Sequence, residues 1–255
     1  ADVAAMTEDL DTGVGRIVAA IDRLGLAGNT YVIYMSDNGG GNRRGPLNGG
    51  KGSVTSNLPL RGMKHNLYEG GIRVPLIVRW PGRIAVGSRS AAPLISNDFY
   101  PTLLDLAGCP QERRQHIDGV SFKDVLLGKR RSVGRKAIYW HYPHSRQEAA
   151  IREGQYKLLH RFGSDRVELY DLKSDIGERN DLSKTNPVLA KRLLGKLKAW
   201  QKSVGAKFAV SSKRKRTAKP RRTAEQLKKM PNVLFICVDD WNDWVGCLGN
   251  KQAQT

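Results

Sequence analysis

The chain is organised around an apolar run that ends in a polar turn: Tyr31-Val32-Ile33-Tyr34-Met35, then Ser36-Asp37-Asn38-Gly39-Gly40. A run of β-branched and aromatic residues of this length is typical of a buried parallel strand. Asp37 and Asn38 would then lie just past its carboxyl end, where open α/β sheets place their sites. A carboxylate beside an amide offers two hard oxygen ligands, which suit Ca²⁺ or Mg²⁺. Taken alone, the tripeptide Asp-Asn-Gly favours an ordinary capped turn, so the metal interpretation depends on the surrounding sequence.

Two further motifs follow in order: Leu60-Arg61-Gly62-Met63-Lys64 and Tyr68-Glu69-Gly70-Gly71-Ile72-Arg73-Val74-Pro75. With Ser-Asp-Asn-Gly before them, they make most of residues 7–205 resemble the sulfatases, the formylglycine-dependent enzymes of the alkaline-phosphatase superfamily. The resemblance implies that Asp37 and Asn38 bind a divalent metal ion. It also implies that Lys64 is a catalytic residue that contacts the sulfate. The Glu and Arg of the third motif match positions whose role in the family is mainly architectural.

Length and composition set the limits of the fold. The 255 residues, 40% of them hydrophobic, allow the core of one domain and a small second unit. Mean hydropathy is −0.47, and no apolar run approaches the length of a membrane span, so no membrane partner is predicted. No signal peptide is visible at Ala1, although sulfatases are often exported, so the localisation stays open. Three cysteines without metal-ligand spacing do not predict a disulfide framework.

The order of the expected elements predicts an α/β fold. We expect a partial, mostly parallel alkaline-phosphatase-like sheet flanked by helices, followed by a small C-terminal antiparallel subdomain of one sheet and one helix. The expected domains are the partial α/β domain 1–134, the antiparallel subdomain 135–205, a basic linker 206–230 and a terminal strand segment 231–255. The expected elements are a helix over 7–25 with Thr7 as N-cap, strands over 31–35 and 74–80, a helix from Ser96 or Asn97 to Leu106, a short helix over 121–127, strands Ala137–Tyr142, Ala150–Phe162 and Val167–Asp171, and a helix that begins at Asn186 and Pro187.

The net charge of +19 is unevenly distributed. Residues 213–229 hold nine basic residues and a single acid, Glu225, which gives this stretch a net charge of +8. We favour a disordered, protease-sensitive linker for it. The alternative is a tail that binds a polyanion, either a sulfated polysaccharide or, less favoured, a nucleic acid.

The end of the chain repeats the pattern of a buried strand followed by acids, in Pro231-Asn232-Val233-Leu234-Phe235-Ile236-Cys237-Val238-Asp239-Asp240. It resembles the first strand of a sulfatase, in which paired aspartates are metal ligands. We therefore expect this strand to pair in parallel beside strand 31–35 and to bring Asp239 and Asp240 to Asp37 and Asn38. The order is permuted and the middle of the family's sequence has no counterpart, which indicates a junction of two sulfatase units, a truncation or a rearranged gene.

The nucleophile that the resemblance implies is absent from the motifs. Sulfatases form formylglycine from a Cys within C-x-P-x-R, and none of Cys109, Cys237 and Cys247 lies in that pattern. The enzyme assignment is therefore left open. We expect a sulfatase-family hydrolase of sulfuric esters, incomplete and inactive alone, with a sulfate ester or sulfated polysaccharide and a complementing sulfatase segment as partners.

Two alternatives remain at this point. One is a phosphatase or phosphonate hydrolase of the same superfamily, which shares the metal ligands. The other is a non-catalytic module that binds sulfated polymers through its basic surface. His141 and His144 could line a substrate pocket, but a packed or solvated histidine is the favoured interpretation.

Overall fold

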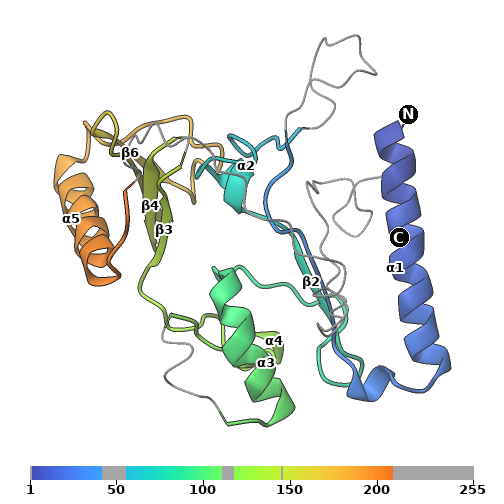
Figure 1. Cartoon of the computed structure of the whole chain (residues 1–255). Helices are drawn as coiled ribbons and strands as arrows, with labels where there is room; N and C mark the ends of the chain where they lie inside the picture. The colour runs from blue at the N-terminus through green and yellow to red at the C-terminus, as the bar shows by residue number, and fades with distance from the viewer. Residues whose placement is uncertain (1, 42–55, 111–117, 145, 209–255) are drawn as a thin grey trace, which may run out of the picture.

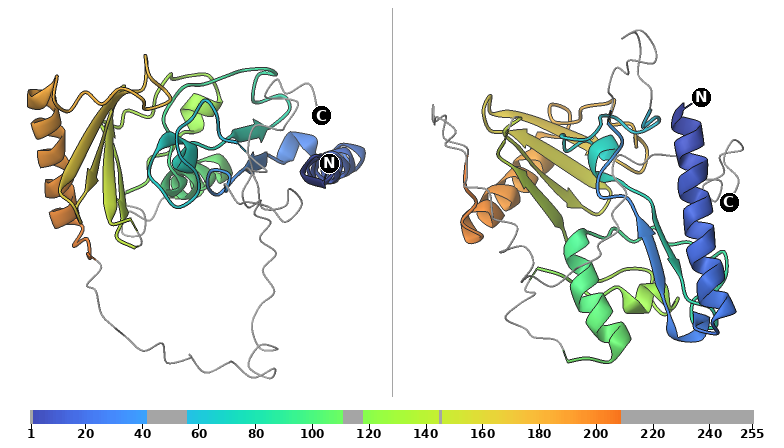
Figure 2. Two further views of the ribbon diagram at one scale, coloured as in Figure 1. Left: turned by 90° about the horizontal axis from the view of Figure 1, so that it is seen from above. Right: turned by 45° about the vertical axis from the view of Figure 1, so that its right-hand side comes forward.

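The computed structural model describes residues 2–41, 56–110, 118–144 and 146–208. Figure 1 shows α1 (Asp2–Arg23) beside a two-stranded ribbon, and a four-stranded antiparallel sheet on the other side of the molecule that α5 (Pro187–Ser203) covers. The two further views in Figure 2 show the same arrangement. Within the described residues no helix has both the length and the apolarity that a membrane crossing requires.

The helix predicted over 7–25 is confirmed, but it starts earlier than expected. α1 begins at Asp2, so Thr7 lies inside the helix and is not its N-cap. The physical reason is that Ala4 and Ala5, the strongest helix formers, precede Thr7 and extend the helix towards the N-terminus. The helix ends before Gly25, whose φ of 69° is the left-handed conformation that stops helices.

The ribbon consists of β1 (Val32–Met35) and β2 (Leu76–Arg79). They pair antiparallel, from Val32 opposite Arg79 to Met35 opposite Leu76. The expectation that strand 31–35 is buried is wrong here, because every residue of β1 is only half-buried. Within the described residues β2 is the only strand that pairs with β1, so the other edge of β1 is not covered by a strand. The parallel partner expected at 233–238 lies outside the described residues.

Short helical pieces lie along the chain between α1 and β3. They are η1 (Ala27–Asn29), α2 (Glu69–Ile72), η3 (Ser96–Asp98), α3 (Phe99–Ala107) and α4 (Lys123–Leu126). Ser96 and Asn97 form the 3₁₀ turn before α3 and do not cap it, since the N-cap position of α3 is Asp98. The carboxylate of Asp98 closes the 3₁₀ turn by accepting from Ile95 N–H at 2.9 Å. Gly108 ends α3 with a φ of 68°, as expected.

The four-stranded sheet confirms the antiparallel prediction but divides one expected strand into two. Its order is β3 (Ile138–Tyr142), β4 (Glu148–Glu153), β5 (Tyr156–Arg161) and β6 (Arg166–Asp171). The single strand expected over Ala150–Phe162 is a hairpin. Gly154, with a φ of 60°, turns the chain, and Glu153 then pairs with Tyr156.

Both faces of this sheet are covered. On one face Ile151, Leu158 and Leu169 pack against Leu193 and Leu197 of α5. The other face contributes a second cluster, in which sheet residues pack against a segment from the first half of the chain; its members are Leu67, Tyr68, Ala150, Leu159, Tyr170 and Leu172. Neighbouring residues of a strand point to opposite faces, so each strand serves both clusters. The segment around α2 is therefore part of the packing of the antiparallel sheet.

Candidate metal and sulfate site

The polar turn after β1 orders its own side chains. Ser36 is fully buried, and its hydroxyl donates to the carbonyl of Asn38 at 2.8 Å. Asn38 donates twice to Asp37 Oδ1, from its backbone N–H at 2.9 Å and from its side-chain amide at 2.8 Å. Asp37 is exposed, and in the described part of the chain its Oδ2 accepts no hydrogen bond. The turn thus presents a carboxylate oxygen outward from a buried anchor.

Two glycines let this turn lie directly on α2. The backbone N–H of Gly39 donates to the carbonyl of Gly71 at 3.1 Å. A Cβ on Gly39 would lie 1.8 Å from the carbonyl oxygen of Gly70, a distance that no side chain can tolerate. The metal loop, which we define as residues 36–41, is therefore seated on the backbone of the third motif, and only glycine permits this approach.

The second motif is attached to the same loop. The backbone N–H of Lys64 donates to the carbonyl of Gly40 at 3.3 Å. Asn57 reinforces this contact: its amide nitrogen donates to the carbonyl of Gly40 at 2.9 Å and to that of Gly62 at 3.1 Å, and its amide oxygen accepts from Gly40 N–H at 3.2 Å. The structure thus brings the segments of Asp37, Asn38 and Lys64 together.

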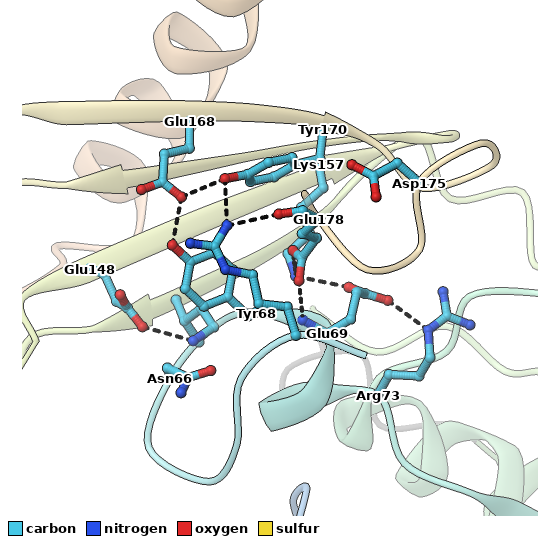
Figure 3. A network of polar contacts seen from close by, with 12 residues as sticks. Asn66, Tyr68, Glu69, Arg73, Glu148, Lys157, Glu168, Tyr170, Asp175 and Glu178 are labelled. Atoms are coloured by element: carbon cyan, nitrogen blue, oxygen red, sulfur yellow. Dashed lines mark hydrogen bonds and ion pairs between the residues drawn. The ribbon is translucent and has the colours of Figure 1, made fainter. Parts of the chain in front are cut away.

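The third motif is held by buried charges, as Figure 3 shows. Lys157 of β5 has no exposed side-chain surface, and its Nζ lies 2.8 Å from Glu69 Oε1 and 2.9 Å from Glu178 Oε1. Glu178 Oε2 accepts from Glu69 N–H at 2.7 Å, and Arg73 Nε lies 2.6 Å from Glu69 Oε2. We call Glu69, Arg73, Lys157 and Glu178 the ion network. It confirms the architectural role expected for Glu69 and Arg73.

The two carboxylates of the ion network respond differently to their surroundings. Burial by itself raises the pKa of Glu69, but Lys157 and Arg73 outweigh burial and hold that pKa below its usual value. For Glu178 burial is the stronger influence, so its pKa is raised despite the contact with Lys157. The cations of the ion network therefore favour the ionised form of Glu69 more strongly than that of Glu178.

A second buried network lies beside the first (Figure 3). The hydroxyls of Tyr68 and Tyr170 both donate to Glu168 Oε2, at 2.6 and 2.8 Å. The guanidinium of Arg61 lies 4.0 Å from the centre of the Tyr68 ring and donates to the Tyr170 hydroxyl at 2.9 Å. Burial and the hydrogen bond to Glu168 raise the pKa of Tyr68 to about 12. The second motif is thereby attached to the antiparallel sheet.

Of the two histidines discussed from the sequence, His141 is packed against other side chains and His144 is exposed. His141 Nδ1 lies 3.0 Å from the amide nitrogen of Gln201, and its Nε2 lies 2.9 Å from the carbonyl of Lys207. Its ring stacks on Phe162 at 5.5 Å between centroids. His144 contacts Tyr142 edge-on at 6.1 Å. The packed interpretation of His141 is confirmed.

The residues present fit a hard divalent ion only in part. Asp37 and Asn38 supply carboxylate and amide oxygens, the donors that Ca²⁺ and Mg²⁺ prefer. In the described ranges no three His, Cys, Asp or Glu residues gather as metal ligands do. The two further expected ligands, Asp239 and Asp240, lie outside the described residues. Formylglycine does not fit: Cys109, the described cysteine, is exposed and lies outside a C-x-P-x-R motif.

Comparison with known families decides the assignment. The family described as N-sulphoglucosamine sulphohydrolase, C-terminal, matches residues 63–203, more than half of the chain. The chain belongs to the sulfatase family. The family described as Sulfatase matches residues 2–109 as well. The two matches overlap over residues 63–109, which include the end of the second motif and the whole third motif. These two motifs also join the metal loop to the antiparallel sheet.

Curated sulfatases are similar over much of this chain. A sulfatase of Formosa agariphila is 37% identical over 227 residues, 78% of this chain and 39% of its own length. An N-acetylglucosamine-6-O-sulfatase of Bacteroides thetaiotaomicron is 35% identical over 182 residues, 68% of this chain and 30% of its own length. The chain therefore spans well under half the length of these relatives.

Solved structures confirm the predicted fold. The carbohydrate complex of Ps i-CgsB with a neocarrahexaose has a TM-score of 0.64 at 33% identity, and covers 74% of this chain and 40% of its own. The complex of BT4656 with its substrate, D-glucosamine-2-N,6-O-disulfate, has a TM-score of 0.62 at 30% identity, and covers 76% of this chain and 38% of its own. The chain is thus a partial α/β sulfatase domain with an antiparallel subdomain.

Sequence reasoning found the candidate ligands Asp37 and Asn38 but missed the residues that hold the segments around them. Asn57 lies in a Gly- and Asn-rich stretch, where an asparagine is an unremarked loop residue. Glu178 lies at the start of a polar run typical of solvated charge, and a lysine such as Lys157 is usually exposed. One signal was available for Lys157: it sits between Tyr156 and Leu158 in a strand with an apolar pattern.

Proposed function

We propose that this chain forms the metal- and sulfate-binding part of a sulfuric ester hydrolase. The observation that carries the proposal is the hydrogen bond from Lys64 N–H to Gly40 carbonyl, which joins the candidate sulfate ligand to the metal loop. Asn57 donates to the same carbonyl at 2.9 Å and to the carbonyl of Gly62 at 3.1 Å, so a side chain also links the two segments. Membership in the sulfatase family supports the reaction class.

Each residue has a distinct task in this proposal. Asp37 and Asn38 hold a Ca²⁺ or Mg²⁺ ion, with Asp239 and Asp240 as the further proposed ligands. When bound, such an ion polarises the sulfate group and draws off its negative charge. Lys64 binds the sulfate oxygens and balances the remaining charge. The Gly39 contact with α2 keeps Asp37 in place, so little reorganisation is needed when the ion and the ester bind.

The chain by itself is proposed to bind without turnover. No cysteine lies in the motif that yields formylglycine, so we derive no nucleophilic step from these residues. Loss of the nucleophile in enzymes that use covalent catalysis costs on the order of 10⁶ in rate. A complementing sulfatase segment, which carries the missing motif, is the proposed partner.

We propose a sulfated saccharide as the substrate class. An N-acetylglucosamine-6-O-sulfatase is among the relatives, and the similar solved structures hold a neocarrahexaose and a disulfated glucosamine. The excess of basic over acidic residues, with a net charge of +19, favours a polyanionic ligand.

The test compares binding and turnover in the full chain. Binding of an aryl sulfate and an aryl phosphate is measured by calorimetry with and without Ca²⁺, and hydrolysis is followed in parallel. We expect Ca²⁺-dependent binding of the sulfate without hydrolysis, weakened by Lys64→Ala and by Asp37→Ala. Lys173→Ala, which removes an exposed lysine of the same charge, is the control and should change nothing.

Three outcomes would contradict parts of this proposal. Ca²⁺-dependent hydrolysis of the aryl sulfate that Lys64→Ala abolishes would show that the chain turns over alone. A preference for the aryl phosphate would favour a phosphatase or phosphonate hydrolase. Binding of a sulfated polymer that needs neither Ca²⁺ nor Lys64 would favour a non-catalytic module.

A further inference from the structure

Contacts with α2 fix the position of the metal loop. Gly39 donates its N–H to Gly71, and its Cα faces the Gly70 carbonyl so closely that a Cβ would overlap it at 1.8 Å. A shift of α2 by even a fraction of an ångström would therefore move the backbone that carries Asp37 and Asn38, since interiors are too closely packed to absorb it.

α2 cannot hold its own position. It has four residues, Glu69–Ile72, and two of them are glycines, so it has neither the length nor the composition of a helix that is stable alone. External contacts fix it instead. Gly70 N–H donates to the Arg61 carbonyl at 2.7 Å, and Glu69 N–H donates to the Glu178 carboxylate at 2.7 Å.

Lys157 supplies the charge that lets these contacts exist. Glu69 and Glu178 are both buried, at 2% and 0% exposure, and both carboxylates contact the same Nζ. Without that ammonium the two carboxylates would face each other out of water, where like charges repel strongly. Arg73, the other cation of the ion network, pairs with Glu69 and not with Glu178 within the described residues, and its side chain is 42% exposed, so it does not balance the charge of Glu178.

We propose that Lys157 is a positioning residue for the metal ion: by neutralising Glu69 and Glu178 it holds α2, and through Gly71 and Gly39 it holds Asp37 and Asn38. This inference rests on the proposed function, in which Asp37 and Asn38 bind the ion. It assigns to a strand of the antiparallel subdomain, 120 residues from Asp37 in sequence, a role in the site of the other half of the chain.

The experiment measures Ca²⁺ affinity by calorimetry and unfolding by urea in the full chain. Lys157→Met removes the charge at similar side-chain length. We expect about a tenfold loss of Ca²⁺ affinity, as is typical when a group that orients metal ligands is removed. Lys157→Met combined with Glu178→Gln should recover most of the affinity, because the charge balance returns and the amide oxygen still accepts from Glu69 N–H.

The matched control separates positioning from general stability. Leu193→Ala weakens the same antiparallel subdomain at its opposite face, where Leu193 packs in a hydrophobic cluster that contains no residue of α2, while Ile72 of α2 packs against the other cluster. It should lower stability and leave Ca²⁺ affinity unchanged. If Lys157→Met and Leu193→Ala lower Ca²⁺ affinity equally, Lys157 acts only through stability and the inference is wrong. An unchanged affinity in Lys157→Met, when Asp37→Ala abolishes binding, refutes it too.

A second readout keeps the test decisive. Amide hydrogen exchange at residues 36–41 reports the seating of the loop without any ion, and it should accelerate in Lys157→Met but not in Leu193→Ala. Unchanged exchange overturns the inference. If Lys157→Met does not fold, Arg73→Gln removes the partly exposed partner of Glu69 and should shift the same exchange in the same direction. If Asp37→Ala leaves Ca²⁺ binding intact, the proposed function fails, and exchange alone decides the role of Lys157.

Discussion

At the scale of single residues, Asp98 shows how one buried carboxylate fixes three parts of the chain. It is fully buried, and it accepts from Ile95 N–H and Val120 N–H at 2.9 Å each while it pairs with Arg135. The side chain of Arg135 is only 12% exposed, so its positive charge is balanced by Asp98 and not by water.

We predict that Asp98→Ala lowers the free energy of unfolding by about 3–5 kcal/mol, because it leaves Arg135 buried without its counter-charge. Urea denaturation measures the loss. The control is Asp124→Ala, which removes the partner of Arg130 from a pair that is 46% and 70% exposed, and it should cost less than about 1 kcal/mol. Equal losses in the two variants would contradict the prediction.

A second prediction at this scale concerns alkaline pH. The pKa of Tyr68 is raised to about 12 by burial and by the hydrogen bond to Glu168, while an unfolded tyrosine titrates near 10. A raised pKa means that the folded state binds the proton more tightly. The contribution of Tyr68 protonation to the free energy of unfolding is therefore complete below pH 10 and is lost as pH rises from 10 to about 12.

Tyr68→Phe should remove this part of the alkaline loss. Its difference in unfolding free energy from the wild type should shrink by about 1.4 kcal/mol per pH unit above pH 10. Urea denaturation between pH 8 and 12 measures the difference. Tyr139→Phe is the control, since it removes the hydroxyl of a tyrosine that stacks on Trp200 outside this network. A constant difference for Tyr68→Phe would contradict the prediction.

At the scale of elements, α5 is the cover of the antiparallel sheet. Leu193 and Leu197 are fully buried in its contact, while Val188 on the same helix is 80% exposed. We predict that Leu193→Ala lowers the free energy of unfolding by about 2–5 kcal/mol, because a buried leucine is removed and a cavity remains. Val188→Ala should change it by less than about 0.5 kcal/mol. Denaturant unfolding compares the two, and a large effect of Val188→Ala would show that α5 packs differently.

The helices and strands also show which sequence signals were sufficient to predict where an element begins or ends. Gly25 and Gly108 ended helices, and Asn186 began one by accepting from Leu189 N–H, because these effects act within one turn. The hairpin at Gly154 was missed because its turn interrupts an apolar pattern for only two residues. The pairing of β1 with β2 was missed because tertiary contacts choose a strand's partner.

In the candidate site, too, some residues could be predicted from the sequence and others could not. Asp37, Asn38 and Lys64 could be predicted because their neighbours form motifs whose chemistry is local. Lys157 and Glu178 could not, because their importance arises from contacts between segments that are 88 to 109 residues apart. A buried ion pair has no local pattern, and in sequence its members resemble surface residues.

At the scale of the whole molecule, burial is uneven. Residues of β4, β5 and β6, together with Leu193 and Leu197 of α5, are fully buried, whereas no residue of β1, of β2 or of 4–23 in α1 is buried. The domain boundary near residue 134 remains a proposal, since the segment around α2 packs on the antiparallel sheet.

We predict that amide exchange follows this division. Amides of β4 and β5 should exchange slowest, near the rate of global unfolding, and those of α1, β1 and β2 should exchange fastest, because their opening exposes little buried apolar surface. Exchange mass spectrometry of the full chain measures both sets in one experiment. Equal protection of β1 and β4 would contradict this view.

The ion network has a consequence for the order in which the protein is made. Glu69 contacts Lys157 and Glu178, which are 88 and 109 residues further along the chain. These partners have not yet been synthesised when α2 leaves the ribosome, so α2 cannot take its final position then. At about 5–20 residues per second, synthesis reaches Glu178 on the order of ten seconds later. The loop of Asp37 and Asn38, although translated early, therefore settles late. During that interval the nascent chain exposes the apolar residues Leu67 and Tyr68, because their packing partners Ala150, Leu159 and Tyr170 have not yet been made.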